Sequence, residues 1–553
     1  MKKILHKTIV AILALSFAFG TLVGCSETDN PVGPNSIQIS YSLGSFGREW
    51  LDEAVKRFNE TFADRGYSAV VDRVDAAFNE DSIKNEIKSI NDNSYDLYIA
   101  ISNNIGLVDD SYSILRKRDE CLLEDLTDMY NSKVINLDGS EGAETVLETR
   151  NAAMLPYHVY NYDNVNFKGK YYGYQWTSAY CGMVMNTKVL KDFGYDHAPR
   201  TTMEMKAICD DIVSKNRKSE NGNTIRPVVW PGANASGYFA YPLFTWMAQY
   251  MGVEDYTDFF KFKPKTGTTI ENGYDVYDNE AILYALRAME TFAAREYAAE
   301  GSLFTLDHML ADGVLMDGEA LFEITGDWSY HEVVGIGYDA EHLSRLEVIP
   351  VPIVSELADK IGLTGSAEEK DTKLSEIIKC IDEGKTDNEI IAQIASVTAD
   401  MVAKVREARG IYYDLGSGHQ AFIPSYSDAK DVAKLFLRFI SSKEFSNSIY
   451  SKNANGITAN VSAVSEDTNF LKSLTKVCRQ AYSTPIAEAI CLSDIRYKGG
   501  ISYTFEPVPH YGQLARSMAQ HTSEYTADEC YAKIKNAMKN NWATILATAG
   551  YYE

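Results

Sequence analysis

The chain has 553 residues, 45% of them apolar, and a formal net charge of −24. It is too long for one compact domain, so we expect two lobes. Its acidic balance argues against a nucleic-acid partner, because phosphate backbones bind basic surfaces.

The first 24 residues have the layout of a secretory signal. Three lysines precede residue 8, and residues 8–24 contain no charge. This apolar stretch is shorter than the roughly 20 residues that a transmembrane helix needs. Residues 22–25, Leu-Val-Gly-Cys, resemble a bacterial lipobox. The resemblance implies cleavage before Cys25 and a lipid on Cys25, whereas the alternative is an uncleaved anchor helix with an incidental cysteine.

A short polar linker follows Cys25. Residues 26–36 contain two prolines, one glycine and no aliphatic run, so we expect a flexible tether. Loss of residues 1–24 removes three lysines and changes the formal charge from −24 to −27. No later apolar stretch is long enough to span a membrane, so we expect the mature chain to be soluble apart from its anchor.

The folded part opens with strands and helices in alternation. Alternating apolar residues predict strands, and apolar residues at helical spacing predict amphipathic helices. The expected elements are strands over 37–41, 68–74 and 96–101, a glycine-rich turn over 43–47, and helices over 48–61 and 81–90. This order predicts an α/β lobe with a mainly parallel sheet.

Later elements carry capping signals. Thr201 with Glu204 predicts a capping box that opens a helix, and Ser441 with Glu444 predicts another. The remaining expected elements are strands over 320–325 and 346–351 and helices over 279–297, 429–440 and 526–548.

Residues 355–410 differ in composition from their surroundings. They are rich in charged residues, Ile and Ala, and nearly free of aromatics. Two capping boxes, Ser366 with Glu369 and Thr386 with Glu389, predict helices there. We interpret the segment as a helical insertion on the outside of the second lobe. It is either a solvated hairpin or a surface for a membrane partner.

Several stretches occur in the order seen in extracellular solute-binding proteins of family 1. These proteins, of the maltose- and multiple-sugar-binding type, deliver sugars to ABC importers. The stretches that resemble them are residues 37–58, 172–175, 185–190, 199–204, 309–328 and 420–444. Met203 stands where the family commonly has Trp, a departure that concerns ligand contacts more than the fold.

The resemblance implies an α/β, two-lobed periplasmic-binding-protein-like fold of type II with about three hinge crossings. Lobe one would hold residues 37–165 and 418–455. Lobe two would hold residues 166–417 and 456–553, including the insertion. The crossings would lie near residues 174–180, 415–418 and 455–458.

A sugar site needs aromatic faces for the C–H side of the ring and polar groups for its hydroxyls. The chain has 36 Tyr and 6 Trp. By the resemblance, Trp328 stacks on a sugar, with Asp327 beside it as a hydroxyl acceptor. The further aromatic candidates are Tyr238, Trp176, Tyr180, Trp230 and Tyr511. For each aromatic candidate the alternative is packing in a core.

Lobe one contributes polar candidates from loops after its strands. Ligands of such sheets collect outside the carboxyl ends of strands. The residues in these loops are Ser45, Phe46, Ser102, Asn103 and Asn104. Their alternative role is the capping of turns.

No catalytic motif emerges. The chain lacks a nucleophile elbow, a zincin helix and a P-loop, and its seven cysteines beside Cys25 are too irregular for a zinc site or a disulfide framework. We expect no enzyme activity, no cofactor and no metal. A lipid-anchored glycoside hydrolase is the enzyme alternative, because carboxylates abound and such enzymes use a pair of them.

The resemblance implies a lipid-anchored component of an ABC importer on the outer face of the cell membrane. It would act as a monomer and bind a carbohydrate by hinge closure, and we expect this ligand to be an oligosaccharide. It would deliver the ligand to permease subunits. The alternative ligand is a peptide, a polyamine or an organic anion.

Overall fold

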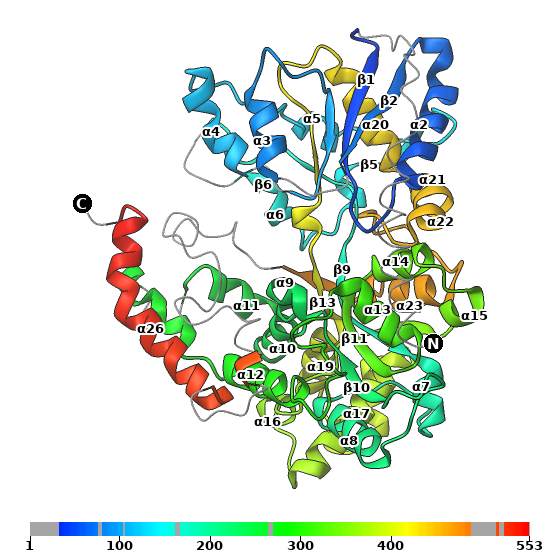
Figure 1. The fold of residues 1–553 in the computed structure, drawn as a ribbon. Coiled ribbons are helices and arrows are strands. Elements are labelled where there is room, and N and C mark those ends of the chain that lie inside the picture. Colours follow the sequence, from blue (N-terminus) through cyan, green and yellow to red (C-terminus); the bar gives the residue numbers. More distant parts are fainter. Residues whose placement is uncertain are drawn as a thin grey trace.

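A computed structural model describes residues 33–75, 80–102, 105–160, 166–263, 269–487, 516–518 and 525–551. They form two lobes, drawn one above the other in Figure 1, each built around its own sheet. The predicted two-lobed α/β architecture is confirmed. Cys25 lies outside the described residues.

The sheet of lobe one has the strand order β2-β1-β3-β14-β8. β1 runs parallel to β2 and β3, while β14 is antiparallel to both of its neighbours. The strands are β1 (Ser36–Ser42), β2 (Ser68–Asp75), β3 (Leu97–Ile99), β8 (Tyr174–Gln175) and β14 (Gln420–Phe422). Six of the seven residues of β1 are buried, and Gln38 is half-buried.

Helices cover both faces of this sheet (Figure 1). α2 buries an apolar stripe that includes Phe58, whose ring packs 5.3 Å from Phe436 of α20. The helices are α2 (Glu49–Phe62), η1 (Ala63–Arg65), α3 (Glu80–Lys88), α4 (Ile105–Leu115), α5 (Thr127–Tyr130), η2 (Leu147–Thr149), α6 (Leu155–His158), α20 (Lys430–Ile440), α21 (Lys443–Phe445), η6 (Ser446–Tyr450) and α22 (Ser451–Ala454). Two small ribbons join them, β4 (Lys133–Ile135) with β5 (Glu141–Thr145) and β6 (Val159–Tyr160) with β7 (Lys170–Tyr171).

The sheet of lobe two is mixed, with the order β10-β11-β9-β13-β15 and β12 paired to β9. Its strands are β9 (Tyr180–Asn186), β10 (Arg226–Val229), β11 (Ala320–Gly326), β12 (Leu346–Ile349), β13 (Ile411–Asp414) and β15 (Thr484–Ile486). Every residue of β9 and β11 is buried, so these strands form the centre of the lobe.

Helices enclose the second sheet, and α10 is buried along almost its whole length. The C-terminal α26 lies along the outside of the lobe, where Trp542 packs 4.9 Å from Phe262 (Figure 1). The elements are α7 (Thr187–Asp192), α8 (Thr202–Lys215), η3 (Gly232–Asn234), α9 (Ala235–Tyr238), α10 (Ala240–Met251), α11 (Val253–Phe260), η4 (Ile270–Tyr277), α12 (Glu280–Phe292), α13 (His308–Met316), α14 (Ser329–Gly335), α15 (Ala340–Leu343), α23 (Asn469–Cys478) and α26 (Ala527–Thr548).

The segment 355–410 folds into four helices around a hydrophobic cluster of its own, which includes Leu374, Ile377 and Val402. The helices are α16 (Leu357–Lys360), α17 (Ala367–Asp382), α18 (Asp387–Gln393) and α19 (Ala399–Gly410). Both predicted capping boxes are present. The prediction of helices here is confirmed.

Three local predictions were wrong. Ser442, and not Ser441, caps α21, while the Glu444 carboxylate accepts from the Leu137 N–H. Thr201 caps α8, but Glu204 accepts from the Arg200 N–H and so completes no capping box. The helix predicted over 279–297 ends at residue 292, because the backbone of residues 297–299 bonds to Val228 of β10 instead.

Within the described ranges, no helix combines the length and apolarity needed to cross a membrane. The six described cysteines are unpaired and buried. Buried thiols of this kind act as small apolar residues, as expected.

Candidate functional site

Three chain segments connect the two sheets, and they bond to one another. Between β8 and β9, the Ser178 N–H donates to the Ile457 carbonyl at 3.0 Å. Between β13 and β14, the Leu415 N–H donates to the Ala179 carbonyl at 2.9 Å. The exact lobe boundaries stay predictions, but these bonds locate the hinge.

A buried carboxyl group ties two of these segments together. Asp414 accepts from the Gly416 N–H at 2.6 Å and from the Ser178 O–H at 3.1 Å. Burial raises the pKa of Asp414 from 3.8 to about 7, although both hydrogen bonds and the nearby Arg479 oppose the shift. Burial raises the pKa of the nearby Asp327 as well, and the charge of Asp414 adds to that shift.

The first loop of lobe one lies against the start of α14 in lobe two. The rings of Phe46 and Trp328 meet edge to face, with centroids 6.4 Å apart and planes at 82°. Beside them Gly47 has a φ of 65°, and a Cβ there would lie 2.4 Å from His331 Nε2. Glycine at position 47 therefore permits this approach of the lobes.

Aromatic side chains continue from this contact into both lobes. Phe46 lies 5.6 Å from Trp176, and Trp328 lies 6.2 Å from Tyr238 and 6.3 Å from Tyr241. We call these five residues the interlobe aromatic cluster. Such edge-to-face pairs are favourable beyond the area that they bury.

Two members of the cluster, Trp176 and Phe46, are buried next to the hinge. Trp176 stacks on Trp50 at 5.4 Å with planes at 11°, and its indole N–H donates to the Ala100 carbonyl at 3.0 Å. Trp176 is 2% exposed and Phe46 is 1% exposed. Both side chains therefore contribute packing to the interlobe contact and expose little of their own surface to solvent.

Trp328 and Tyr238 retain more surface, with 7% and 9% exposed. Trp328 follows β11, and a Cβ on Gly326 would lie 2.3 Å from its ring. Glycine at that position lets the indole lie across the end of the strand. Trp328 and Tyr238 are both candidates from the sequence, and the fold brings their side chains together.

Three other candidates lie inside lobe two. Trp230 is fully buried and stacks on Phe239 at 4.6 Å. The Tyr180 hydroxyl donates to the Ile349 carbonyl beneath the sheet. Asp327 is fully buried, and neither of its carboxylate oxygens has a hydrogen-bond partner.

Not all of the remaining candidates lie within the described residues. Ser45 is half-buried in the loop that touches α14, and Ser102 is buried. Asn103, Asn104 and Tyr511 lie outside the described residues.

A chain of three buried carboxyl groups lies behind the interlobe contact. It comprises Asp312 of α13, Glu323 of β11 and Glu332 of α14. Burial raises the pKa of all three, and the mutual charges of Asp312, Glu323 and Glu332 add to the shift of Asp312. Four of their six carboxyl oxygens, Asp312 Oδ2, Glu323 Oε1 and Oε2 and Glu332 Oε2, are buried without a hydrogen-bond partner.

This chain reaches the lobe boundary through Glu332. His308 Nε2 lies 3.3 Å from Glu332 Oε1, and both His308 and a hydrogen bond with Ser45 oppose the burial-driven rise in the pKa of Glu332. No group of three or more His, Cys, Asp and Glu residues in the described part of the chain has the geometry of a metal site.

Known proteins resemble this chain in fold rather than in sequence. No protein-family model matches the sequence, and no curated protein matches it. Among solved structures, RafE from Streptococcus pneumoniae aligns with a TM-score of 0.57 at 11% identity, covering 92% of this chain and 98% of that one. The bacterial solute receptor AcbH, described as having an exclusive preference for β-D-galactopyranose, aligns with a TM-score of 0.54 at 11% identity, covering 92% and 100%.

MalE3 of T. maritima, solved with maltose bound, aligns with a TM-score of 0.51 at 14% identity, covering 91% of this chain and 99% of that one. The fold is that of the solute-binding proteins. The expected architecture is thus confirmed independently of sequence similarity. In a solute-binding fold the lobes can close on a ligand, and the aromatic cluster lies where they meet.

Sequence reasoning missed several residues of this region. Tyr241, Tyr413 and His419 join the aromatic contacts, and Tyr450 packs 6.5 Å from Phe46 and donates to the Thr177 hydroxyl. No local motif marks them, because the fold brings them in from separate segments. The π-helix η6 that ends at Tyr450 is a feature often found near functional sites.

The raised pKa of Asp414 predicts a fall in stability with rising pH. Below about pH 4 the carboxyl group is protonated in both the folded and the unfolded chain. Between about pH 4 and pH 7 the unfolded chain releases this proton while the folded chain keeps it, so the free energy of unfolding falls. We expect the difference in melting temperature between pH 5 and pH 7.5 to be smaller in Asp414→Asn than in the wild type.

Differential scanning calorimetry at the two pH values measures this difference. Asp64→Asn, at an exposed position, is the matched control and should behave as the wild type. An unchanged difference in Asp414→Asn would contradict a protonated hinge carboxyl.

Proposed function

We propose that this chain is the carbohydrate-binding component of an ABC importer and that it closes on an oligosaccharide between its lobes. The observation that carries the proposal is the aromatic cluster that joins Phe46 of lobe one to Trp328 of lobe two within a solute-binding fold. The neighbours named above, described as binding galactopyranose or maltose, support the ligand class.

The chemistry of the cluster suits a sugar. The C–H face of a sugar ring packs on flat aromatic surfaces, and Trp328 and Tyr238 retain surface at the lobe boundary. The Ser45 hydroxyl and the Glu332 carboxyl group can bond to sugar hydroxyls from opposite lobes. A ligand held by both lobes would stabilise the closed arrangement.

Closure would proceed as rotation about the hinge. The bonds among residues 178, 179, 415 and 457 join the crossing segments to one another, so they can persist while the lobes turn. An open form would admit the ligand, and the closed form would gain contacts from the second lobe. A membrane permease would then recognise the closed form.

A second candidate ligand is an amine-bearing solute such as a polyamine. The specific observation in its favour is the carboxyl chain of Asp312, Glu323 and Glu332 close to Trp328 and Tyr238. Aromatic faces and carboxylates together attract ammonium groups. The two candidates differ in the ligand and share the closure mechanism.

The proposal includes attachment to the outer face of the membrane through a lipid on Cys25. The signal-like leader and the linker of residues 26–36 support it. Two acyl chains hold a protein stably, while one chain holds it only marginally. Tethering keeps a binding protein at high local concentration near its permease.

Replacement of Trp328 tests the ligand site. We expect at least one of galactose, maltotriose, raffinose, xylotriose and chitotriose to raise the melting temperature of the wild type. Because a stacking surface is removed, Trp328→Ala should bind that sugar at least about tenfold more weakly by calorimetry, equivalent to about 1.4 kcal/mol. Trp328→Phe, which keeps an aromatic face, should retain part of the affinity.

The matched control is Tyr112→Ala, because Tyr112 is an aromatic residue of lobe one that is 49% exposed. Its sugar affinity should equal that of the wild type. A panel with no sugar response but a response to spermidine would reject the carbohydrate ligand and support the amine. Hydrolysis of an oligosaccharide would favour a glycoside hydrolase instead.

Replacement of Cys25 tests the anchor. Cells expressing the wild type should incorporate radiolabelled palmitate into the chain and keep it in the membrane fraction. Cys25→Ser should incorporate none, because it lacks the thiol that receives the lipid. Cys121→Ser is the control for a general loss of cysteine, and equal labelling of all three chains would contradict lipidation at Cys25.

A further inference from the structure

A cavity lies entirely within lobe two, apart from the lobe boundary. Its volume is about 650 Å³, within the usual range for small-molecule sites. It is bounded by α7, the loop of residues 196–200, the edge strand β12, α23 and the ends of α17 and α19. No member of the aromatic cluster lines it, so it is distinct from the proposed sugar site.

Basic side chains dominate the polar lining of this cavity. Five cationic side chains face three carboxylates, which leaves an excess of two positive charges in a chain of formal charge −24. The cationic residues are Lys191, Arg200, Arg409, Lys472 and Lys476. We call this cavity the basic pocket.

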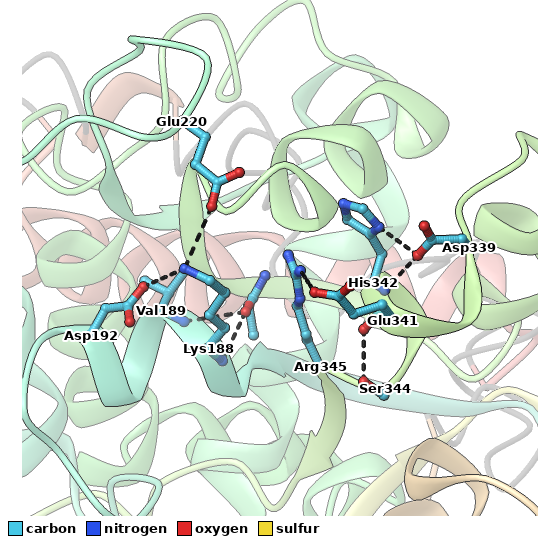
Figure 2. Close-up of polar contacts among 10 residues, drawn as sticks. Lys188, Val189, Asp192, Glu220, Asp339, Glu341, His342, Ser344 and Arg345 are labelled. Atoms are coloured by element: carbon cyan, nitrogen blue, oxygen red, sulfur yellow. Dashed lines mark hydrogen bonds and ion pairs between the residues drawn. The ribbon is translucent and has the colours of Figure 1, made fainter.

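The three lysines of the basic pocket have no ion-pair partner within the described residues. The neighbouring surface cavity, about 140 Å³ on the other side of α7, differs in this respect. There Lys188 pairs with Asp192 at 2.7 Å, and Arg345 pairs with Glu341 at 2.6 Å (Figure 2). Lys188 and Arg345 beside the smaller cavity thus have acidic partners, whereas Lys191, Lys472 and Lys476 of the basic pocket have none within the described residues.

Arg409 gives the pocket a fixed guanidinium group. Its Nε and Nη2 donate to the two carboxylate oxygens of Asp382 at 3.0 and 2.8 Å. The residue is only 8% exposed, and its Nη1 is buried without a hydrogen-bond partner. Such a planar, pre-oriented group suits phosphate and carboxylate oxygens.

The helical insertion forms the wall of the basic pocket that carries Arg409 and Asp382. Asp382 ends α17 and Arg409 lies in the last turn of α19, so both members of the ion pair come from residues 355–410. The remaining cations come from the body of lobe two, since Lys191 belongs to α7 and Lys472 to α23. The insertion therefore completes a pocket that the rest of the lobe leaves open on one side.

We propose that the basic pocket binds a small anion with two or more negative charges, carried by phosphate or carboxylate groups. The opposing acids do not cancel the charge, because Asp382 is already paired with Arg409 and Asp196 is almost fully exposed to solvent. Glu347 of β12 is the third acid. At physiological salt, charges beyond about 8 Å are screened, so the local excess outweighs the acidic character of the whole chain.

The same chemistry can come from a free phosphate ester or from the headgroup of an anionic phospholipid. Pyrophosphate and bis(glycerophospho)glycerol, the deacylated headgroup of cardiolipin with two charged phosphodiester groups, serve as probes of the two sources. The tighter binder identifies the source, and binding of either one supports the site. Affinity should fall as salt is raised, because the interaction is largely between exposed charges.

Isothermal titration calorimetry of the full chain at low ionic strength tests the proposal. The triple variant Lys191→Ala, Lys472→Ala and Lys476→Ala should weaken binding of the better probe at least tenfold. The matched control carries Lys443→Ala, Lys452→Ala and Lys539→Ala, three exposed lysines elsewhere with the same change in charge. It should bind as the wild type, and both variants should melt at the wild-type temperature.

Absence of heat with both probes at millimolar concentration would overturn the proposal. An equal loss in the two triple variants would also overturn it, since it would show attraction to net charge without a site. Sugar affinity measured in the same variants should not change. Failure of the basic pocket is therefore distinguishable from failure of the proposed sugar function.

Discussion

The hinge holds the two lobes in register, and the position of every interlobe contact depends on it. Its bonds run between crossing segments: Ser178 to the Ile457 carbonyl, Leu415 to the Ala179 carbonyl, and Asp414 to Gly416 and Ser178. Asp414 is fully enclosed, which is why its carboxyl group keeps a proton that an exposed aspartate would lose. Stacking of Trp176 on Trp50 adds an apolar support beneath these bonds.

Charged and titratable side chains are distributed unevenly within lobe two. Lobe two holds a chain of carboxyl groups in its interior, with Glu323 and Asp312 leading to Glu332 at the lobe boundary, and burial raises the pKa of each. Its outer face holds unpaired lysines around Arg409. Net charge alone would suggest a uniformly acidic protein, yet carboxyl groups lie at one candidate site and lysines line the other.

Local patterns predicted the elements well. The alternation of residues 37–41 and the capping boxes at Ser366 and Thr386 depend on near neighbours, and the structure confirms them. The end of α12 was misplaced because Val228, distant in sequence, competes for the backbone of residues 297–299.

The site was harder to predict from the sequence. Trp328 could be chosen from its position after a strand, whereas Tyr241 joins it only through the packing of α10. Trp230 has the same residue type and a similar loop context, but it stacks on Phe239 inside the core. Residue type thus indicated the chemistry of the site, and tertiary contacts decided which aromatic side chains face the lobe boundary.

Small-angle X-ray scattering on the chain with and without a carbohydrate that raises its melting temperature tests the central claim of hinge closure most directly. If the sugar stabilises the contact between Phe46 and Trp328, the radius of gyration should fall on binding and the interlobe distances should shorten. A saturating sugar that leaves the scattering curve unchanged would contradict closure of the lobes as the binding mechanism.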